Sequence, residues 1–582
     1  MKRLLWLIAL PCAAQTPDFV QNIAPIVYKD CAPCHRPGES GPFPLLTYTD
    51  VKKHAIQIAD VTRRRFMPPW LPEPGHGDFQ DELRLTDAQI KTFAEWAAAG
   101  APEGPASETP APPQFTNGWQ LGPPDLILEA PEPFTVPAEG ADVYWNFIFT
   151  ATNTTSRWIR AIEIRPGDKR LLHHANLYVD RAHSARLQET SSGAGFPGMD
   201  PIIERSIFEP DDGHFLYWKP GSIPFSEMDG LAWRLDPGND LVLNAHLQPS
   251  GKPEQLRPKI GLYFTDKPRQ FYPLLVQLEH DGALNIPPGV HDFLVSDDFK
   301  LPMDVYALAI YPHAHYLGKV LEAYATLPTG EKKWLIRIPN WDPNWQAVYR
   351  YRDPVLLPKG TVISMRFHYD NSTANPRNPH DPPIRVHDGN QATDEMAHLF
   401  LQLMPPGTHD RRLELQEAVL RRRVEKYPGD AKAHLNIGAI RLARLDPPGA
   451  SVELQESVRL DPGNPESRNM LGSALLGLGR TAEAIAQFQV ALKLRPDYQN
   501  ARYNLARALI KTGRLDEALE SFREVVAAFP RDAAAHNGLG ELLYMQGKYA
   551  DAMEQFDAAI QIDPSNEIAK KNRDQAAARM SK

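Results

Sequence analysis

Histidines at three places in the middle of the chain have the type and spacing of metal ligands. In "YPHAHYLGK", His313 and His315 stand one residue apart in an apolar stretch, and alternate residues of a strand point to the same face. "LLHHANLYVD" contains His173 and His174, and "LVLNAHLQPSG" contains His246. An adjacent pair normally points to opposite faces, so both members bind one metal only at a bulge or strand end. Each strand histidine alone is more often a surface or core residue, but the ordered set predicts metal binding.

A methionine, Met396 in "TDEMAHLFLQL", follows these histidines near the end of the same region. The order resembles the copper type II, ascorbate-dependent monooxygenases, which include peptidylglycine alpha-hydroxylating monooxygenase and dopamine beta-monooxygenase. "HAHYLGKV", from His313 to Val320, and "DEM", which ends at Met396, are the matching stretches. The resemblance covers roughly residues 125–405 and implies two jelly-roll-like β-sandwiches that face each other across a solvent cleft.

The resemblance also implies two copper ions. The electron-transfer copper would be held by His173, His174 and His246, and the oxygen-binding copper by His313, His315 and Met396. Imidazole suits both copper oxidation states, whereas a soft thioether favours Cu(I), the state that must meet oxygen. Hydroxylation needs two electrons beyond those of the substrate, so the second metal stores one of them. His368 in "RFHYDN" is an alternative ligand.

Three positions depart from the peptide-hydroxylating members of that family. Tyr311 stands where those enzymes have the arginine that holds the substrate carboxylate, and His398 and Phe400 replace an asparagine and a tyrosine. The middle region also contains no cysteine, whereas those enzymes have several disulfides. The metal ligands are retained without the known substrate contacts, so a peptidylglycine substrate is not expected. The substrate, whether a small molecule or peptide-like, stays open.

Near the N-terminus, "CAPCH" places Cys31, Cys34 and His35 in the C-x-x-C-H pattern of covalent haem c attachment. Two thiols add to the haem vinyl groups, and the histidine binds iron on one face. A disulfide or a redox dithiol is the alternative for the cysteine pair. Met67 in "RRRFMPPW" is the predicted second axial ligand, because thioether ligation is common in cytochromes c, and His54 is its rival.

The stretch "LTDAQIKTFAEWAAAG" predicts the helix that closes this haem domain. Thr86 is an N-cap residue, Phe93 and Trp96 repeat at helical spacing, and Gly100 ends the helix. This resembles the C-terminal helix of a small class I cytochrome c, and the resemblance covers about residues 16–105.

Prolines recur with a period of 34 residues in the last part of the chain. They are Pro428, Pro462, Pro496, Pro530 and Pro564. Small residues recur in phase between them, which is the tetratricopeptide repeat pattern. We expect four repeats over 431–564, with one helix before and a capping helix after. Such arrays have concave surfaces that bind proteins, so a protein partner is predicted.

Composition and charge bear on the kind of partner that the protein binds. The 582 residues are 42% apolar with a net charge of -9 and no long basic run, which disfavours nucleic acid as the main partner.

"MKRLLWLIALPCAA" predicts a signal peptide over residues 1–14, too short to span a bilayer. A lipoprotein modified at Cys12 is the alternative. We therefore expect a periplasmic or secreted protein without a membrane span.

The elements that must position these residues form a multidomain chain: a small all-α cytochrome c domain, two all-β jelly-roll-like sandwiches and an all-α tetratricopeptide solenoid. The expected ranges are a signal peptide 1–14, a haem domain 16–105, a Pro-rich linker 106–122, sandwiches 123–270 and 271–405, and repeats with flanking helices 409–582. The predicted function is an exported copper- and haem-dependent monooxygenase that hydroxylates a C–H bond with O2, the haem supplying electrons. The alternative is a non-catalytic electron-transfer or copper-binding scaffold with a docking module.

Overall fold

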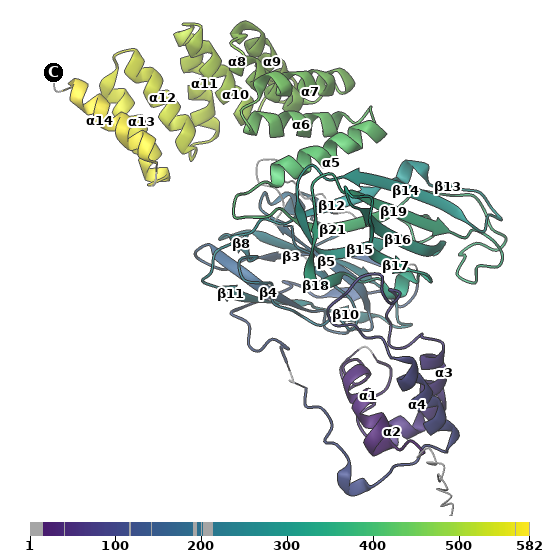
Figure 1. The fold of residues 1–582 in the computed structure, drawn as a ribbon. Coiled ribbons are helices and arrows are strands. Elements are labelled where there is room, and N and C mark those ends of the chain that lie inside the picture. The colour runs from purple at the N-terminus through teal and green to yellow at the C-terminus, as the bar shows by residue number, and fades with distance from the viewer. Residues whose placement is uncertain are drawn as a thin grey trace, which may run out of the picture. The chain divides into compact units, whose positions relative to one another are not determined.

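A computed structural model describes residues 16–39, 41–115, 118–140, 142–189, 195–199, 201, 213–564 and 566–580. The predicted signal peptide and the alternative lipidation site at Cys12 lie outside these residues. The chain forms two compact units, whose main boundary falls between Leu415 and Gln416. Figure 1 shows the helices and strands of both units.

The N-terminal part of the first unit is helical. Its helices are α1 (Ala24–Asp30), α2 (Tyr48–Lys53), α3 (Ala55–Arg63) and α4 (Asp87–Ala98). The predictions for α4 are confirmed: Thr86 and Gln89 form a capping box at its start, and Gly100 follows its end with a φ of +81°. Phe93 and Trp96 are fully buried in the core of this helical region. The apolar spacing of the sequence therefore buries one face of α4.

Two facing antiparallel sheets make up the first β region. One sheet has the order β1 (Leu126–Glu129), β11 (Lys259–Thr265), β4 (Arg157–Arg165) and β8 (Trp233–Leu235). The other has the order β6 (Phe196–Pro197), β3 (Val143–Thr150), β9 (Asp240–Leu247), β5 (Leu172–Asp180) and β7 (Tyr217–Trp218). A single apolar core between them includes Phe147 and Ile260. The end of the predicted linker packs here, since the amide of Gln120 donates to Glu163 at 2.7 Å.

The second β region repeats this arrangement. One sheet has the order β12 (Leu274–Glu279), β21 (His398–Met404), β15 (Val305–His313) and β18 (Tyr349–Leu357). The other has the order β14 (Phe293–Lys300), β19 (Val362–Tyr369), β16 (Gly318–Thr326) and β17 (Lys332–Ile338). Two further pairs are β2 (Phe134–Val136) with β10 (Glu254–Leu256), and β13 (Asn285–Ile286) with β20 (Val386–His387). Among the described strands none pairs across the predicted boundary at residue 270, so the mostly β middle region divides there.

The segment that follows Met67 leaves the helical region and packs on the second β region. Phe79 forms an isolated antiparallel bridge with Tyr351 and is buried. The amide of Glu73 donates to the carbonyl of Arg337 at 2.7 Å, and the two side chains form an ion pair. The sequence placed this segment within the haem domain, but these contacts attach it to strands β17 and β18.

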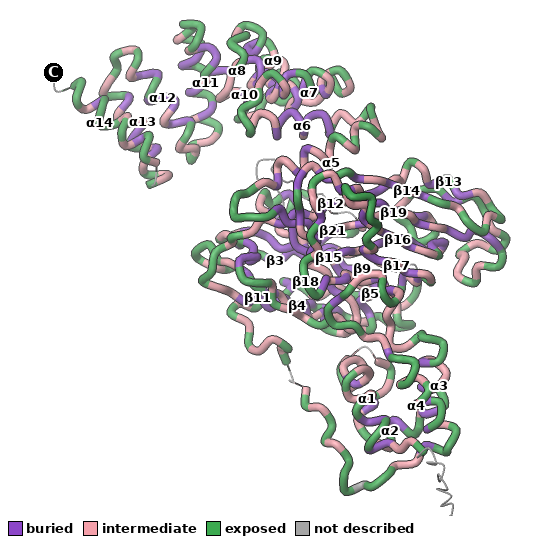
Figure 2. The backbone as a smooth tube through the Cα atoms, viewed as in Figure 1, coloured by how far each residue is buried: buried purple, intermediate pink, exposed green. Residues whose placement is uncertain are grey.

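The second unit is a series of paired helices. They are α6 (Ala431–Ala443), α7 (Pro447–Leu460), α8 (Pro465–Gly477), α9 (Thr481–Leu494), α10 (Gln499–Lys511), α11 (Leu515–Ala528), α12 (Ala533–Met545) and α13 (Tyr549–Ile562). They are preceded by α5 (Arg412–Lys426) and followed by α14 (Glu567–Met580), as the 34-residue period predicts. Figure 2 shows the buried residues where neighbouring helices face each other. Small residues are needed there, since a Cβ on Gly472 would lie 2.5 Å from the Phe488 ring.

Candidate metal centre and haem cavity

Three imidazoles converge on paired strands of the first β region. His173 and His174 lie on β5 and His246 lies on β9, where His174 and His246 are direct cross-strand partners. The register between β5 and β9 shifts between Leu172 and His174. This irregularity brings the adjacent pair to one side, which is the condition that the sequence set for a shared metal.

The spacing of the ring nitrogens matches a metal coordination sphere. The Nδ1 atom of His173 lies 3.2 Å from the Nδ1 atom of His246 and 3.2 Å from that of His174. Nitrogens bound tetrahedrally to one metal at about 2.0 Å are about 3.3 Å apart. One ligand atom from each of the three residues lies within 4.8 Å of the others. Three imidazoles so placed form a donor set for copper or zinc.

Hydrogen bonding and burial prepare these imidazoles to bind a cation. The Nε2 atom of His246 lies 2.7 Å from a carboxylate oxygen of Asp142, so Nε2–H donates and Nδ1 keeps its lone pair. This hydrogen bond lowers the pKa of Asp142. Burial lowers the pKa of His173 to about 4 and that of His174 well below its ordinary value, which favours the neutral form of both rings. The Tyr144 ring stacks on His246 at 4.4 Å, with its hydroxyl 3.4 Å from Nδ1.

The His313–His315 pair has its own orienting partners in the second β region. Nδ1 of His313 lies 2.7 Å from Oε1 of Gln346, and Nδ1 of His315 lies 3.0 Å from the carbonyl oxygen of Asp394. Both acceptors are oxygens, so each Nδ1–H donates and each Nε2 is left with a lone pair. The two rings are 5.2 Å apart between centroids. The two rings therefore have the same tautomer, with the lone pair on Nε2.

A buried carboxylate brings the Met396 segment to this pair. Glu395 is fully buried and accepts the amides of His315 at 2.8 Å, Leu317 at 2.6 Å and Met396 at 3.3 Å. The backbone of Met396 is thereby fixed beside the turn that contains His315. Within the described part of the chain, no third histidine, cysteine or carboxylate completes a metal-sized group with His313 and His315. Ligation by Met396 stays a prediction.

Two further histidines of this region have carboxylate partners. His398 lies directly across from His313 in the β15–β21 pair, with ring centroids 6.2 Å apart, and its Nε2 lies 2.7 Å from Asp281. His368, the alternative ligand, lies on β19 with Nδ1 2.7 Å from Asp292. The sequence suggested His398 only as a departure from the resembled family, and nothing in the sequence pointed to its partner Asp281.

The C-x-x-C-H residues line a cavity of about 860 Å³, a volume typical of ligand sites. Cys31, Cys34, His35 and Met67 all contribute to its wall. Cys31 and Cys34 form no disulfide in this structure. Nδ1 of His35 lies 3.1 Å from the carbonyl oxygen of Phe43, which leaves Nε2 with the lone pair that an axial ligand needs.

The residues that line the cavity fit a haem. They also distinguish between Met67 and His54 as the predicted second ligand of its iron. Met67 lines the cavity, whereas His54 is not part of the described lining. The His54 ring is instead stacked on Phe43 at 3.7 Å, with Nδ1 3.1 Å from Gln57. The thioether is therefore the better-placed ligand.

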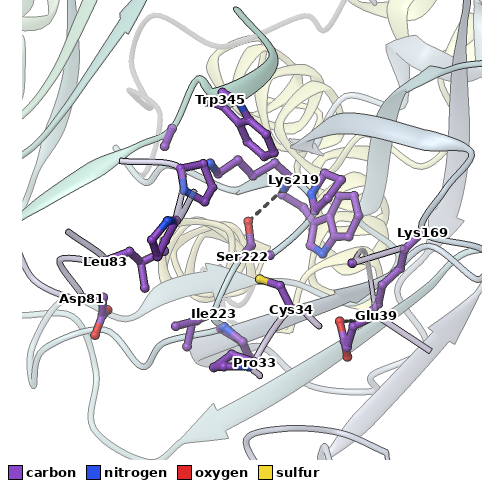
Figure 3. A pocket seen from close by; sticks show the side chains of 18 of the residues that line it. Pro33, Cys34, Glu39, Asp81, Leu83, Lys169, Lys219, Ser222, Ile223 and Trp345 are labelled. Carbon is purple, nitrogen blue, oxygen red and sulfur yellow. Dashed lines mark hydrogen bonds and ion pairs between the residues drawn. The ribbon is translucent and has the colours of Figure 1, made fainter. Parts of the chain in front are cut away.

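The same cavity extends to the first β region. Lys219, Ser222 and His173 also line it. Figure 3 shows the Cys34 sulfur beside Ser222. The Ser222 hydroxyl oxygen accepts a hydrogen bond from the backbone amide of Lys219 at 2.9 Å. Burial lowers the pKa of Lys219 to about 8. His173 of the three-histidine cluster thus lines the same cavity as the haem-attachment motif.

Comparisons with known proteins concern the second unit. Residues 440–499, 469–525 and 503–567 match the sequence profile of the tetratricopeptide repeat. The C-terminal part of the chain is a tetratricopeptide repeat array. No curated protein matches the chain.

Solved structures that match part of the chain include YrrB, described as a TPR protein with an unusual peptide-binding site. It is 26% identical, with 28% of this chain and 84% of that chain covered and a TM-score of 0.26. MamA is 22% identical over 26% of this chain and 89% of that chain, with a TM-score of 0.25. PilF of Pseudomonas aeruginosa is 23% identical over 29% and 81%, with a TM-score of 0.26. Across the described residues, no helix has the length and apolarity needed to cross a membrane.

Proposed function

We propose that this protein is an exported copper- and haem-dependent redox enzyme, a monooxygenase that hydroxylates a C–H bond with O2. The observation that supports it most is the three-histidine cluster, whose Nδ1 atoms of His173 and His246 are 3.2 Å apart. His173 also lines the cavity of the C-x-x-C-H motif, so the haem and the first copper would lie close enough to exchange electrons.

In this proposal the haem cavity is the entry point for electrons. Cys31 and Cys34 would attach the haem, and His35 and Met67 would bind its iron. Haem supplies one-electron transfer when bound. The chain's own contribution is the carbonyl of Phe43, which holds a proton on Nδ1 of His35 and aims Nε2 into the cavity.

The two copper sites have different roles in this proposal. The first copper would be held by His173, His174 and His246, and the second by His313, His315 and Met396. Copper supplies electron storage at the first site and oxygen activation at the second. Protein groups orient the ligands at both sites: Asp142 accepts from Nε2–H of His246, and Gln346 accepts from Nδ1–H of His313. These partners fix the tautomers before any metal arrives.

The deciding experiment measures haem, copper and oxygen uptake on the purified full chain. We expect two copper ions and one haem per chain, and O2 uptake that depends on a substrate from a metabolite panel. His313→Ala should abolish this uptake and remove copper from one site while the haem spectrum persists. His291→Ala is the matched control, because the His291 side chain is 70% exposed. A wild-type protein that binds no copper would refute the proposal.

One observation favours a non-catalytic electron-transfer or copper-binding protein as the second candidate. The described lining of the large cavity includes His173 but neither His313 nor His315. Tyr311 and Gln346 both contact His313. Such a protein would bind copper and haem and exchange electrons, but would consume no O2 with any substrate of the panel.

The repeat array is proposed to dock a protein partner, since tetratricopeptide arrays bind proteins through their concave face. Removing residues 431–582 should abolish that binding and leave copper and haem content unchanged. Repeats fold through contacts with their neighbours, so their loss need not disturb the β regions. Loss of copper from the truncated chain would mean that the array supports the metal sites.

A further inference from the structure

A row of four aromatic rings joins the two histidine sites. The ring centroids of His174 and Tyr217 are 6.0 Å apart, those of Tyr217 and Tyr311 are 5.4 Å apart, and those of Tyr311 and His313 are 6.1 Å apart. Each step is within the range of aromatic contact. The row begins at a member of the three-histidine cluster and ends at the His313–His315 pair.

The two tyrosines come from different β regions and are held from several sides. Tyr217 lies on β7, which pairs with β5, and Tyr311 lies on β15. The Tyr311 hydroxyl donates to Oε1 of Gln346 at 2.9 Å, and Phe400 stacks on its ring at 5.9 Å. Rings from both β regions are therefore in direct contact.

The second tyrosine of the row shares an acceptor with a candidate ligand. The Tyr311 hydroxyl donates to Oε1 of Gln346, and Nδ1 of His313 lies 2.7 Å from the same oxygen. The contact between the sites is therefore made of conjugated rings and one hydrogen-bonded bridge.

We propose that Tyr217 and Tyr311 form the electron path between the two metal sites, an inference that rests on the proposed function. One electron leaves the metal at the three-histidine cluster, which is oxidised, and enters the metal at His313 and His315, which is reduced. No bond forms or breaks, and neither phenol gains or loses a proton. Tyr217 also lines the haem cavity, so the path adjoins the electron source.

The test follows reduction of each copper by a one-electron donor without oxygen, by rapid freezing and electron paramagnetic resonance. Tyr217→Leu and Tyr311→Leu remove a ring from the row, whereas Tyr217→Phe and Tyr311→Phe keep it. Tyr306→Leu is the matched control: Tyr306 lies on the same strand as Tyr311 but packs in a separate cluster around Leu231. Copper content and the visible haem spectrum are recorded for every variant to exclude misfolding.

We expect the leucine variants to slow reduction of the second copper by about tenfold or more, about 1.4 kcal/mol in barrier height. Reduction of the first copper should keep its rate, and the phenylalanine and Tyr306 variants should stay within about threefold of wild type. If both leucine variants bind two copper ions and reduce the second at the wild-type rate, the path is refuted while the proposed function stands. A wild-type chain that binds no copper refutes the proposed function itself.

Discussion

Replacing Glu395 by glutamine should loosen the turn that contains His315. The carboxylate uses both oxygens: Oε1 accepts from the amide of Leu317, and Oε2 accepts from the amides of His315 and Met396. Glutamine has one acceptor oxygen and one NH2 group. Whichever way the amide is turned, at least one buried backbone N–H then faces a donor instead of an acceptor.

The size of the destabilisation follows from the number of backbone N–H groups that lose their acceptor, which is at least one. A buried backbone group without a partner costs about 1–3 kcal/mol, so the local opening free energy of the turn should fall by at least this amount. Because about 1.4 kcal/mol is a factor of ten, amide exchange of the turn should accelerate about 5- to 150-fold. Burial raises the pKa of Glu395 to about 8, so the comparison is made above that pH, where the carboxylate is ionised. Hydrogen exchange measured there by mass spectrometry on peptides covering residues 313–320 of the metal-free protein gives this number directly.

A matched variant separates this local effect from a general loss of charge. Glu322→Gln changes a partly buried glutamate on the neighbouring strand β16, whose carboxylate pairs with the Arg337 side chain. It should leave exchange at residues 313–320 unchanged. Glu395→Gln should also weaken copper binding at the second site, since the turn is no longer fixed. Wild-type exchange rates for this turn in Glu395→Gln would show that the carboxylate does not hold it.

Three further changes test other parts of the structure. Asp142→Asn should weaken metal binding at the three-histidine cluster by about 10- to 100-fold, as loss of an orienting carboxylate does elsewhere, and competition with a chelator would measure it. An unchanged affinity would assign Asp142 no part in orienting its histidine. Met67→Ala should change the haem absorption spectrum and lower the reduction potential, because Met ligation raises it, whereas His54→Ala should change neither. Gly472→Ala places a Cβ 2.5 Å from a phenylalanine ring and should destabilise the repeat array by about 1–3 kcal/mol in thermal unfolding followed by circular dichroism. Gly463→Ala, with its nearest neighbour at 3.6 Å, is the control and should unfold like wild type.

Features that depend on neighbours along the chain could be predicted from the sequence. The capping box at Thr86 and the stop at Gly100 involve residues only a few positions apart, and both are present. The 34-residue period specified the paired helices of the array, because each repeat packs mainly on the next one. The condition that His173 and His174 share a metal only at an irregularity also follows from strand geometry, and the β5–β9 register shifts there.

Sequence alone thus determined which residue types could bind haem and metal, the order in which they occur, and the helical repeats. The tertiary structure decided which partners orient them. Asp142 meets His246 from 104 positions away, and Gln346 meets His313 from 33 positions away. Tyr217 meets Tyr311 only because the two β regions pack together. Strand register and the packing of sheets set these contacts, and neither leaves a local pattern in the sequence from which such pairs could be read.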